Sequence, residues 1–238
     1  MDVKEEHILG SKIAEHWYYK SKAVALKGFV ADLKIARILD VGAGSGFFSR
    51  HLLMCTNATE AVCVDTSYTE EQDDMVAGKP IHFRKSIAQT HADLVLMMDV
   101  IEHVDDDRAL LKEYLDIAPS GTHFFVTVPA FSFLWSEHDI FLGHRRRYTL
   151  KELEQVVALA GASVERSSYI FGTVFPIAVF QRLLMRIKIG RSTEPRSQLK
   201  QHWKITNHLL RKLCEADQRW GRNNKVAGLT AACLARKP

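Results

Sequence analysis

The sequence predicts an α/β fold with a mostly parallel sheet, and three observations support this fold class. Short apolar runs typical of buried strands recur along the chain. Segments with the apolar spacing of helices separate these runs. A turn with three alternating glycines joins the first run directly to a helix. This alternation indicates parallel strands joined by right-handed crossovers, and 238 residues are enough for one domain with an elaboration.

The expected elements follow one another at short intervals. Strands are expected over residues 37–41, 61–65, 81–84, 93–98, 123–128, 163–170 and 227–236, and helices over residues 46–54, 105–117 and 150–160. Residues 7–33 have apolar side chains at helical spacing and predict an N-terminal helix pair. Because little chain separates the second, third and fourth strands, almost no helix is expected after the third. Residues 171–226 form a long insertion before the last strand.

Composition and cysteine usage favour a cytoplasmic protein. The first ten residues lack the basic and then apolar pattern of a secretory signal. The longest apolar stretch, residues 170–184, is interrupted by Pro176, Gln181 and Arg182 and is too short to cross a bilayer. The cysteines show no C-x-x-C pairing, and Cys63 and Cys233 lie in strand-like runs, so they are expected to be buried free thiols.

The glycine-rich turn after the first strand indicates a ligand site. Gly42, Gly44 and Gly46 let the backbone turn sharply where a Cβ atom would collide, and the turn directs amide groups and a helix N-terminus toward a ligand. The dinucleotide-binding fingerprint requires G-x-G-x-x-G, whereas here Phe47 occupies the place of its third glycine. Asp40 would repel a pyrophosphate and suits a cationic ligand. A purely structural turn and a nicotinamide or flavin site are the alternatives.

Three segments resemble a known family. D-V-G-A-G-S-G resembles the first motif of class I S-adenosylmethionine (SAM) methyltransferases. D-V-I-E-H-V after the fourth strand resembles the L-E-H-V signature of ubiquinone-biosynthesis O-methyltransferases and related small-molecule methyltransferases. The loop after the fifth strand, with F-S-F-L-W and G-H-R-R-R-Y-T, resembles bacterial methyltransferases of the type 11/23 group. The resemblance implies a Rossmann-like seven-stranded sheet with helices on both faces and the last strand antiparallel beside the fifth. With the N-terminal helical spacing, the expected division is a helical segment at 1–36 and a methyltransferase domain at 37–238. In the family strands six and seven nearly form a hairpin, whereas here insertion 171–226 separates them.

SAM is the cofactor that this resemblance implies. Ligands of such sheets bind beyond the carboxyl ends of the strands where strand order reverses. Asp65 ends the second strand and suits the ribose hydroxyls, although it could instead cap a helix. Lys20 and Lys22 depart from the arginines that some relatives have in an N-terminal helix. The implied cofactor-binding residues are Asp40, Gly42, Ala43, Gly44, Gly46, Asp65, Thr66, Ser86, Met98 and Asp99.

Candidate catalytic groups follow the fourth and fifth strands. Asp99, Glu102 and His103 lie within five residues, and two groups of relatives bind a divalent metal through E-x-x-E-H at this place. His144 matches a second histidine of the RNA-methylating group, and magnesium or manganese would suit the set. The alternative is that Glu102 and His103 brace the cleft and a histidine acts as general base. We therefore assign no metal ligands and name His103, His138 and His144 as candidate catalytic residues.

The acceptor side is rich in aromatic and basic residues. The loop after the fifth strand holds Phe131, Phe133 and Trp135, and this composition predicts an acceptor pocket. Arg145–Arg147 either clamp an anion or pair with the acidic run at 105–107. Residues 171–191 form an apolar patch edged with cations. This patch predicts either contact with the inner membrane face or a core or dimer-forming helix.

These features together favour a SAM-dependent O-methyltransferase acting on a small-molecule or lipid-linked acceptor. The net charge is +4, and residues 182–225 hold twelve Lys or Arg against three acids. The basic stretch keeps an RNA-end 2′-O-methyltransferase as an alternative, although nucleic acid is the less favoured partner. A catalytically silent SAM-binding module and a nicotinamide oxidoreductase are two further hypotheses. The sequence indicates no oligomeric state.

Overall fold

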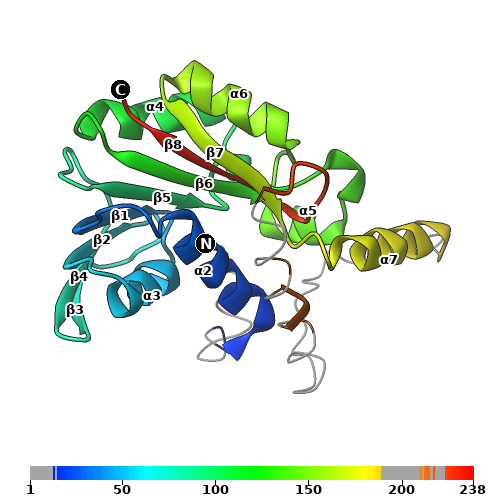
Figure 1. Ribbon diagram of the computed structural model, residues 1–238, viewed down its shortest axis with the longest axis horizontal. Coiled ribbons are helices and arrows are strands. Elements are labelled where there is room, and N and C mark those ends of the chain that lie inside the picture. Colours follow the sequence, from blue (N-terminus) through cyan, green and yellow to red (C-terminus); the bar gives the residue numbers. More distant parts are fainter. Residues whose placement is uncertain (1–12, 14, 189–209, 211, 215–216, 218–222) are drawn as a thin grey trace.

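An eight-stranded sheet forms the centre of the computed structural model (Figure 1), in the order β3-β4-β2-β1-β5-β6-β8-β7. The structure describes residues 13, 15–188, 210, 212–214, 217 and 223–238. The strands are β1 (Arg37–Val41), β2 (Glu60–Val64), β3 (Gln72–Val76), β4 (Lys79–Arg84), β5 (Leu94–Met98), β6 (His123–Pro129), β7 (Ser163–Ile170) and β8 (Thr230–Arg236). The α-helices are α2 (Trp17–Phe29), α3 (Phe47–Cys55), α4 (Asp107–Ile117), α5 (Glu137–Leu142), α6 (Leu150–Ala160) and α7 (Phe175–Lys188).

The order of the strands creates a reversal beside β1. From β1 the chain builds outward through β2 to β4, and it then returns to place β5 and β6 on the other side of β1, all parallel. Strand β8 lies antiparallel between β6 and β7. The fifth expected strand, over residues 123–128, is β6, so the expected position of the last strand beside it is confirmed. The expected absence of a helix between β4 and β5 is confirmed too.

One strand was not expected, so the prediction of seven strands is wrong by one. β3 pairs antiparallel with β4 at the edge of the sheet, through a two-residue turn at Ala77 and Gly78. Both turn residues have positive φ, 52° and 77°, as the type I′ turn of a tight hairpin requires. The β3 sequence, QDDMV, is polar and mostly exposed, so it lacks the apolar run by which the other strands were recognised.

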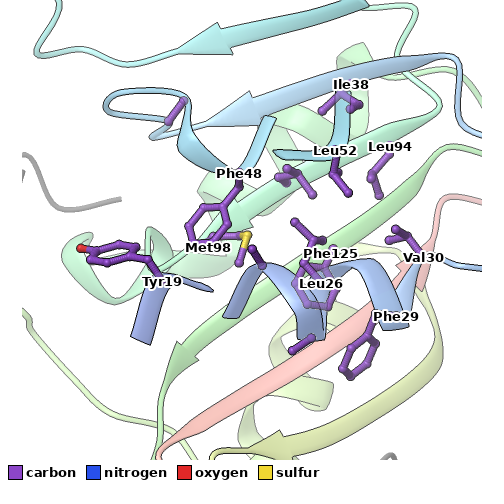
Figure 2. Packing of buried hydrophobic residues seen from close by; sticks show 14 of the residues in the cluster. Tyr19, Leu26, Phe29, Val30, Ile38, Phe48, Leu52, Leu94, Met98 and Phe125 are labelled. Carbon is purple, nitrogen blue, oxygen red and sulfur yellow. The ribbon is translucent and has the colours of Figure 1, made fainter. Parts of the chain in front are cut away.

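Helices cover both faces of the sheet and bury two apolar clusters. Helices α2 and α3 pack on one face, and α4 and α6 pack on the other. Figure 2 shows Leu26 and Phe29 of α2 and Leu52 of α3 directed toward strand residues such as Leu94 and Phe125. Strand β5 is buried along its whole length, which explains its uninterrupted apolar sequence.

The two ends of the predicted architecture are described in part. Of the expected N-terminal helix pair, α2 is present, and residues 7–12 and 14 lie outside the described residues. Of the insertion, the structure describes α7, which extends away from the sheet beside α5 (Figure 1). In the described part of the chain we find no helix with the length and apolar character needed to cross a membrane. Cys63 and Cys233 are buried free thiols, as expected, and the division into segments 1–36 and 37–238 stays a prediction.

Candidate active site

The glycine turn between β1 and α3 has a shape that only glycine permits. Gly42 has φ 65°, and a Cβ atom there would lie 2.7 Å from Cγ2 of Val100. Gly46 has φ 70°, and its Cβ atom would lie 3.1 Å from Sγ of Cys63 and from a ring carbon of Phe83. Gly44 also has positive φ, at 53°. The turn therefore packs tightly against β2, β4 and the segment that follows β5.

The amide groups of this turn are used within the chain. The N–H groups of Gly42 and Ala43 donate to the carbonyl oxygen of Val64, at 2.7 and 3.3 Å, and that of Gly46 donates to Ala43. The N–H group of Gly44 donates to Oδ2 of Asp65 at 3.0 Å. The expectation of free amide donors at these four positions is therefore not met. The turn offers a ligand its shape and close backbone approach.

Asp65 is fixed in place where β2 ends. Besides the amide of Gly44, its carboxylate accepts hydrogen bonds from the backbone N–H group and the hydroxyl of Ser67, at 2.9 and 2.6 Å. No helix follows it in the described chain before β3, so it does not cap one, and it organises a turn instead. Thr66 and Ser86 are exposed just beyond β2 and β4, at the same edge of the sheet.

Asp40 points toward helix α3. Its carboxyl group is buried and accepts a hydrogen bond from the Ser49 hydroxyl at 2.8 Å. Burial raises the pKa of Asp40 to about 6, although the Ser49 hydrogen bond opposes this rise. The carboxyl group is therefore a partly protonated link between β1 and α3 near neutral pH, and its contact with a cationic ligand stays a prediction.

Asp99 lies just after β5 in a left-handed conformation, with φ 57°. The ammonium group of Lys22, which is wholly buried on α2, donates to its carboxylate. The hydroxyl of Thr127 on β6 donates to the other carboxylate oxygen at 3.2 Å. Burial acts to raise the pKa of Asp99, but the charge and hydrogen bond of Lys22 outweigh it and hold the pKa below its ordinary value. Met98 is buried, and Figure 2 places its side chain in the apolar cluster, so its contact with a ligand stays a prediction.

Three side chains from two segments gather next to Asp99. Glu102 and His103 lie on the short 3₁₀ turn Ile101–His103, and His144 comes from the loop after α5. Each offers one donor atom, and these atoms lie within 4.8 Å of one another. The ring centroids of the two histidines are 4.9 Å apart. The backbone N–H group of Arg145 donates to the carbonyl of Glu102 at 2.8 Å, so a backbone contact joins the two segments.

The electrostatics of this cluster are unusual. Glu102 is fully buried, and neither of its carboxylate oxygens has a hydrogen-bond partner among the described residues. Burial, and secondly the charge of Asp99, raise the pKa of Glu102 well above its ordinary value. Burial, and secondly the neighbouring His144, lower the pKa of His103 to about 4. A buried carboxylate without a partner beside two imidazoles is a donor set that fits a divalent metal ion.

The structure bears on three expectations about this side of the site. Asp99 pairs with Lys22, whereas the metal-compatible cluster consists of Glu102, His103 and His144. His138 lies in the first turn of α5, where its backbone N–H group donates to the Ser136 hydroxyl, and it is not part of the cluster. The three arginines pair with carboxylates, which supports the alternative to an anion clamp: Arg145 with Asp105, Arg146 with Asp107, and Arg147 with Asp139.

The aromatic loop after β6 packs against two later elements. Phe131 stacks on Tyr169 of β7 with ring centroids 4.9 Å apart, and it lies 5.4 Å from the ring of Phe175 at the start of α7. Phe133 is about half exposed and lies beside the ring of Phe175. The loop and α7 thus form one aromatic surface close to the carboxyl end of β6.

Fold and site together define the class of protein. A parallel sheet whose last strand is antiparallel, with a glycine turn after β1 and an acidic residue after β2, is the fold of class I SAM-dependent methyltransferases. Residues 15–167 match the family model described as "Methyltransferase domain". The chain belongs to this family, and it is a SAM-dependent methyltransferase.

Solved structures support the same fold at low sequence identity. The methyltransferase in a Haloferax volcanii complex with the activator Trm112 is 15% identical, with a TM-score of 0.55 over 95% of this chain and 92% of that one. Phosphoethanolamine N-methyltransferase 2 of Haemonchus contortus, solved with SAM, is 16% identical, with a TM-score of 0.57 over 98% and 56%. The [4+2]-cyclase SpnF is 12% identical, with a TM-score of 0.57 over 92% and 81%. A cyclase with this fold shows that the site, and not the fold, must identify the reaction.

Proposed function

We propose that this methyltransferase acts on an oxygen atom of a small-molecule or lipid-linked acceptor. The observation that carries the proposal is the cluster of Glu102, His103 and His144 at the carboxyl edge of the sheet. A hydroxyl group that is methylated must lose its proton, so the protein needs a group that receives the proton or lowers the hydroxyl pKa. This buried set of one carboxylate and two imidazoles can do either.

The donor side of the proposed site lies at the reversal of strand order. The turn at 42–46 would lie against SAM, Asp65 would accept its ribose hydroxyls, and the segment at 98–99 would face its methionine end. Thr66 and Ser86 would lie near the adenine of SAM. Asp40 would hold the glycine turn in place through its hydrogen bond with Ser49. SAM supplies an activated methyl group on a sulfonium. The chain aligns the acceptor in line with that group and excludes water from it.

His103 is the candidate general base. Because its pKa is lowered to about 4, its ring is neutral near pH 7 and has a lone pair that can accept the acceptor's proton. His144 lies next to it and can share that role, and His138 is a third candidate from the start of α5. Replacing His103 with Ala should lower turnover by about 10²–10⁴-fold, whereas cofactor affinity should change little.

A divalent metal ion is the alternative occupant of the same cluster. Glu102, His103 and His144 would hold magnesium or manganese, which would bind the acceptor hydroxyl and lower its pKa. After treatment with a chelator, the enzyme should lose activity and regain it with either ion. Unchanged turnover in chelator would remove the metal and leave the histidines as bases.

The acceptor atom can be tested directly. The purified enzyme with SAM should methylate hydroxyl-bearing acceptors, such as a quinol or a polyprenyl-linked sugar, and mass spectrometry of the product would locate the methyl group on oxygen. Methylation of nitrogen alone would contradict the proposal. Binding of SAM without turnover on lipid, sugar or RNA acceptors would instead point to a silent SAM-binding module.

An RNA end with a free 2′-hydroxyl is the second candidate acceptor. The excess of Lys and Arg over residues 182–225 favours it, because such charge binds phosphates. RNA binding that falls steeply with rising salt, together with methylation of a 3′-terminal ribose, would support this candidate. RNA affinity that is weak at low salt would remove it.

Contact with an anionic membrane surface would suit a lipid-linked acceptor. On α7, Ile177, Phe180, Leu183 and Leu184 are each at least 43% exposed, and cations follow them in the sequence. A cytoplasmic protein with such a helix would bind the inner membrane face through residues 171–191. Phe180→Glu should weaken sedimentation with anionic vesicles. The matched control is Met54→Glu on α3, because both side chains are 63% exposed. Equal binding by both variants would contradict the membrane contact.

A further inference from the structure

The carboxylate of Asp139 lies directly behind His144. It is fully buried on α5, and its Oδ1 lies 2.9 Å from Nδ1 of His144. A histidine that donates through Nδ1 keeps the lone pair of Nε2 free for another role. His144 offers one ring nitrogen to the cluster with His103 and Glu102, and because Nδ1 lies against Asp139, Nε2 is the nitrogen that remains for this role.

Several further bonds fix the Asp139 carboxylate. Arg147 donates to both of its oxygens, from Nε at 2.7 Å and from Nη2 at 3.0 Å, and this paired contact is rigid. Arg147 also donates to the carbonyl of Ala130 at 3.0 Å, which anchors the group to the end of β6. The backbone N–H group and hydroxyl of Ser136 donate to Oδ2 at 2.9 and 3.1 Å. Burial acts to raise the pKa of Asp139, but the hydrogen bonds of His144 and Arg147 hold it well below its ordinary value.

We propose that Asp139 is a positioning residue that holds His144 as the Nδ1–H tautomer, with Nε2 directed into the cluster of Glu102 and His103. This inference rests on the proposed function for the role of the cluster, but the tautomer itself does not depend on it. In water the neutral imidazole prefers its proton on Nε2, so the fold reverses the preference by placing a carboxylate at Nδ1. Nε2 of His144 is thereby presented to an acceptor proton or to a metal ion, in an orientation that Asp139 and Arg147 fix.

The first experiment reads the tautomer without any substrate. Long-range ¹H–¹⁵N correlation spectra of the full chain, recorded at about pH 9 where histidine is neutral, distinguish the two tautomers by their nitrogen shifts. The expected result for His144 is the Nδ1–H form in the wild-type protein. Its assignment comes from the signal lost in His144→Gln. A wild-type protein with the Nε2–H form would overturn the inference, whatever its methyltransferase activity.

Variants then separate positioning from structural support. Asp139→Asn should shift His144 toward the Nε2–H form and lower kcat by about 10–100-fold, with the KM for SAM little changed. Ser136→Ala is the matched control, because it removes the hydroxyl's hydrogen bond to the same carboxylate and the cap of α5 but leaves the contact with His144. Equal loss of activity in both variants would assign Asp139 a structural role only.

The wild-type tautomer spectrum stays a valid test even if Asp139→Asn is poorly folded, and a double variant tests the coupling to His144 where the protein folds. If Asp139 acts through His144, adding Asp139→Asn to His144→Gln should lower kcat by less than about twofold more, because the effects of groups that act as a unit do not add. A double variant whose loss of kcat equals the product of the two single-variant losses would overturn the inference. If the wild-type tautomer is Nδ1–H but neither substitution affects turnover, the positioning stands and the proposed function of the cluster fails.

Discussion

At the scale of single residues, the pair of Lys22 and Asp99 joins the N-terminal helix to the end of β5. The lysine side chain is 0% exposed and that of Asp99 is 25% exposed. Removing one member of such a pair leaves the other charge uncompensated in the interior. Lys22→Met should therefore lower the free energy of unfolding by an amount near the lower end of ~3–5 kcal/mol.

A double-mutant cycle measured by urea denaturation tests this coupling. Lys22→Met combined with Asp99→Asn should cost clearly less than the sum of the single changes, because no lone charge remains. Lys112→Met is the matched control, since its ion pair with Asp116 on α4 is exposed and should contribute little. Strictly additive losses for Lys22 and Asp99 would show that the two groups do not interact in solution.

A second prediction at this scale concerns pH. The pKa of the buried Asp40 is raised from 3.8 to about 6. Its contribution to stability is thus fully present below the unfolded pKa of about 3.9 and is lost as pH rises through about 6. Asp40→Asn stays neutral, so relative to the wild type it should become more stable between about pH 4 and 7, by up to roughly 3 kcal/mol. Urea denaturation at several pH values measures this difference, and the exposed Asp116→Asn should show no such trend.

At the scale of elements, the glycine turn should tolerate no side chain at Gly42. Gly42→Ala places a methyl group 2.7 Å from Val100 in a backbone with φ 65°. The strained backbone costs about 1–2 kcal/mol, and overpacking adds about 1–3 kcal/mol. Gly78→Ala in the β3–β4 hairpin is the matched control, because φ is 77° and no atom lies within 4 Å of the added methyl group. Denaturation should show a larger loss for Gly42→Ala, partly restored by Val100→Ala, and equal losses would contradict the packing argument.

The sequence predicted those elements whose signal lies within the element itself. β5 was recognised because both faces are buried and every residue is apolar. α6 was recognised by its helical spacing of apolar residues, and in the structure Thr149 and Glu152 form a capping box at its start. β3 was missed because an exposed edge strand needs no apolar run and is defined by its partner β4. The helix α5 was missed for a related reason, since six residues carry too short a pattern.

The candidate site shows the same limit between distant parts of the chain. Asp99, Glu102 and His103 were found together because they are neighbours in sequence, and His144 was found through a family motif. The partner of Asp99 is 77 residues away and on another layer of the fold, so no local pattern indicates it. The sequence likewise left open whether the arginines at 145–147 bind an anion or pair with carboxylates. Their pairing with the acidic run at 105–107 is visible only in the folded chain.

At the scale of the whole molecule, donor binding should stabilise the fold as a unit, because the proposed site joins the ends of β1, β2, β4 and β5. A free SAM concentration of about one hundred times its Kd raises the free energy of unfolding by about 2.7 kcal/mol. This corresponds to a rise in melting temperature of roughly 5–10 °C for a chain of this size. SAM and S-adenosylhomocysteine should produce this shift in a thermal denaturation assay, and NAD should not. Asp65→Ala should reduce the shift, whereas the surface control Asp116→Ala should keep it. A shift with NAD but none with SAM would contradict the assignment of the donor site, because the turn at 42–46 would then accommodate a pyrophosphate despite the carboxylate of Asp40 beneath it.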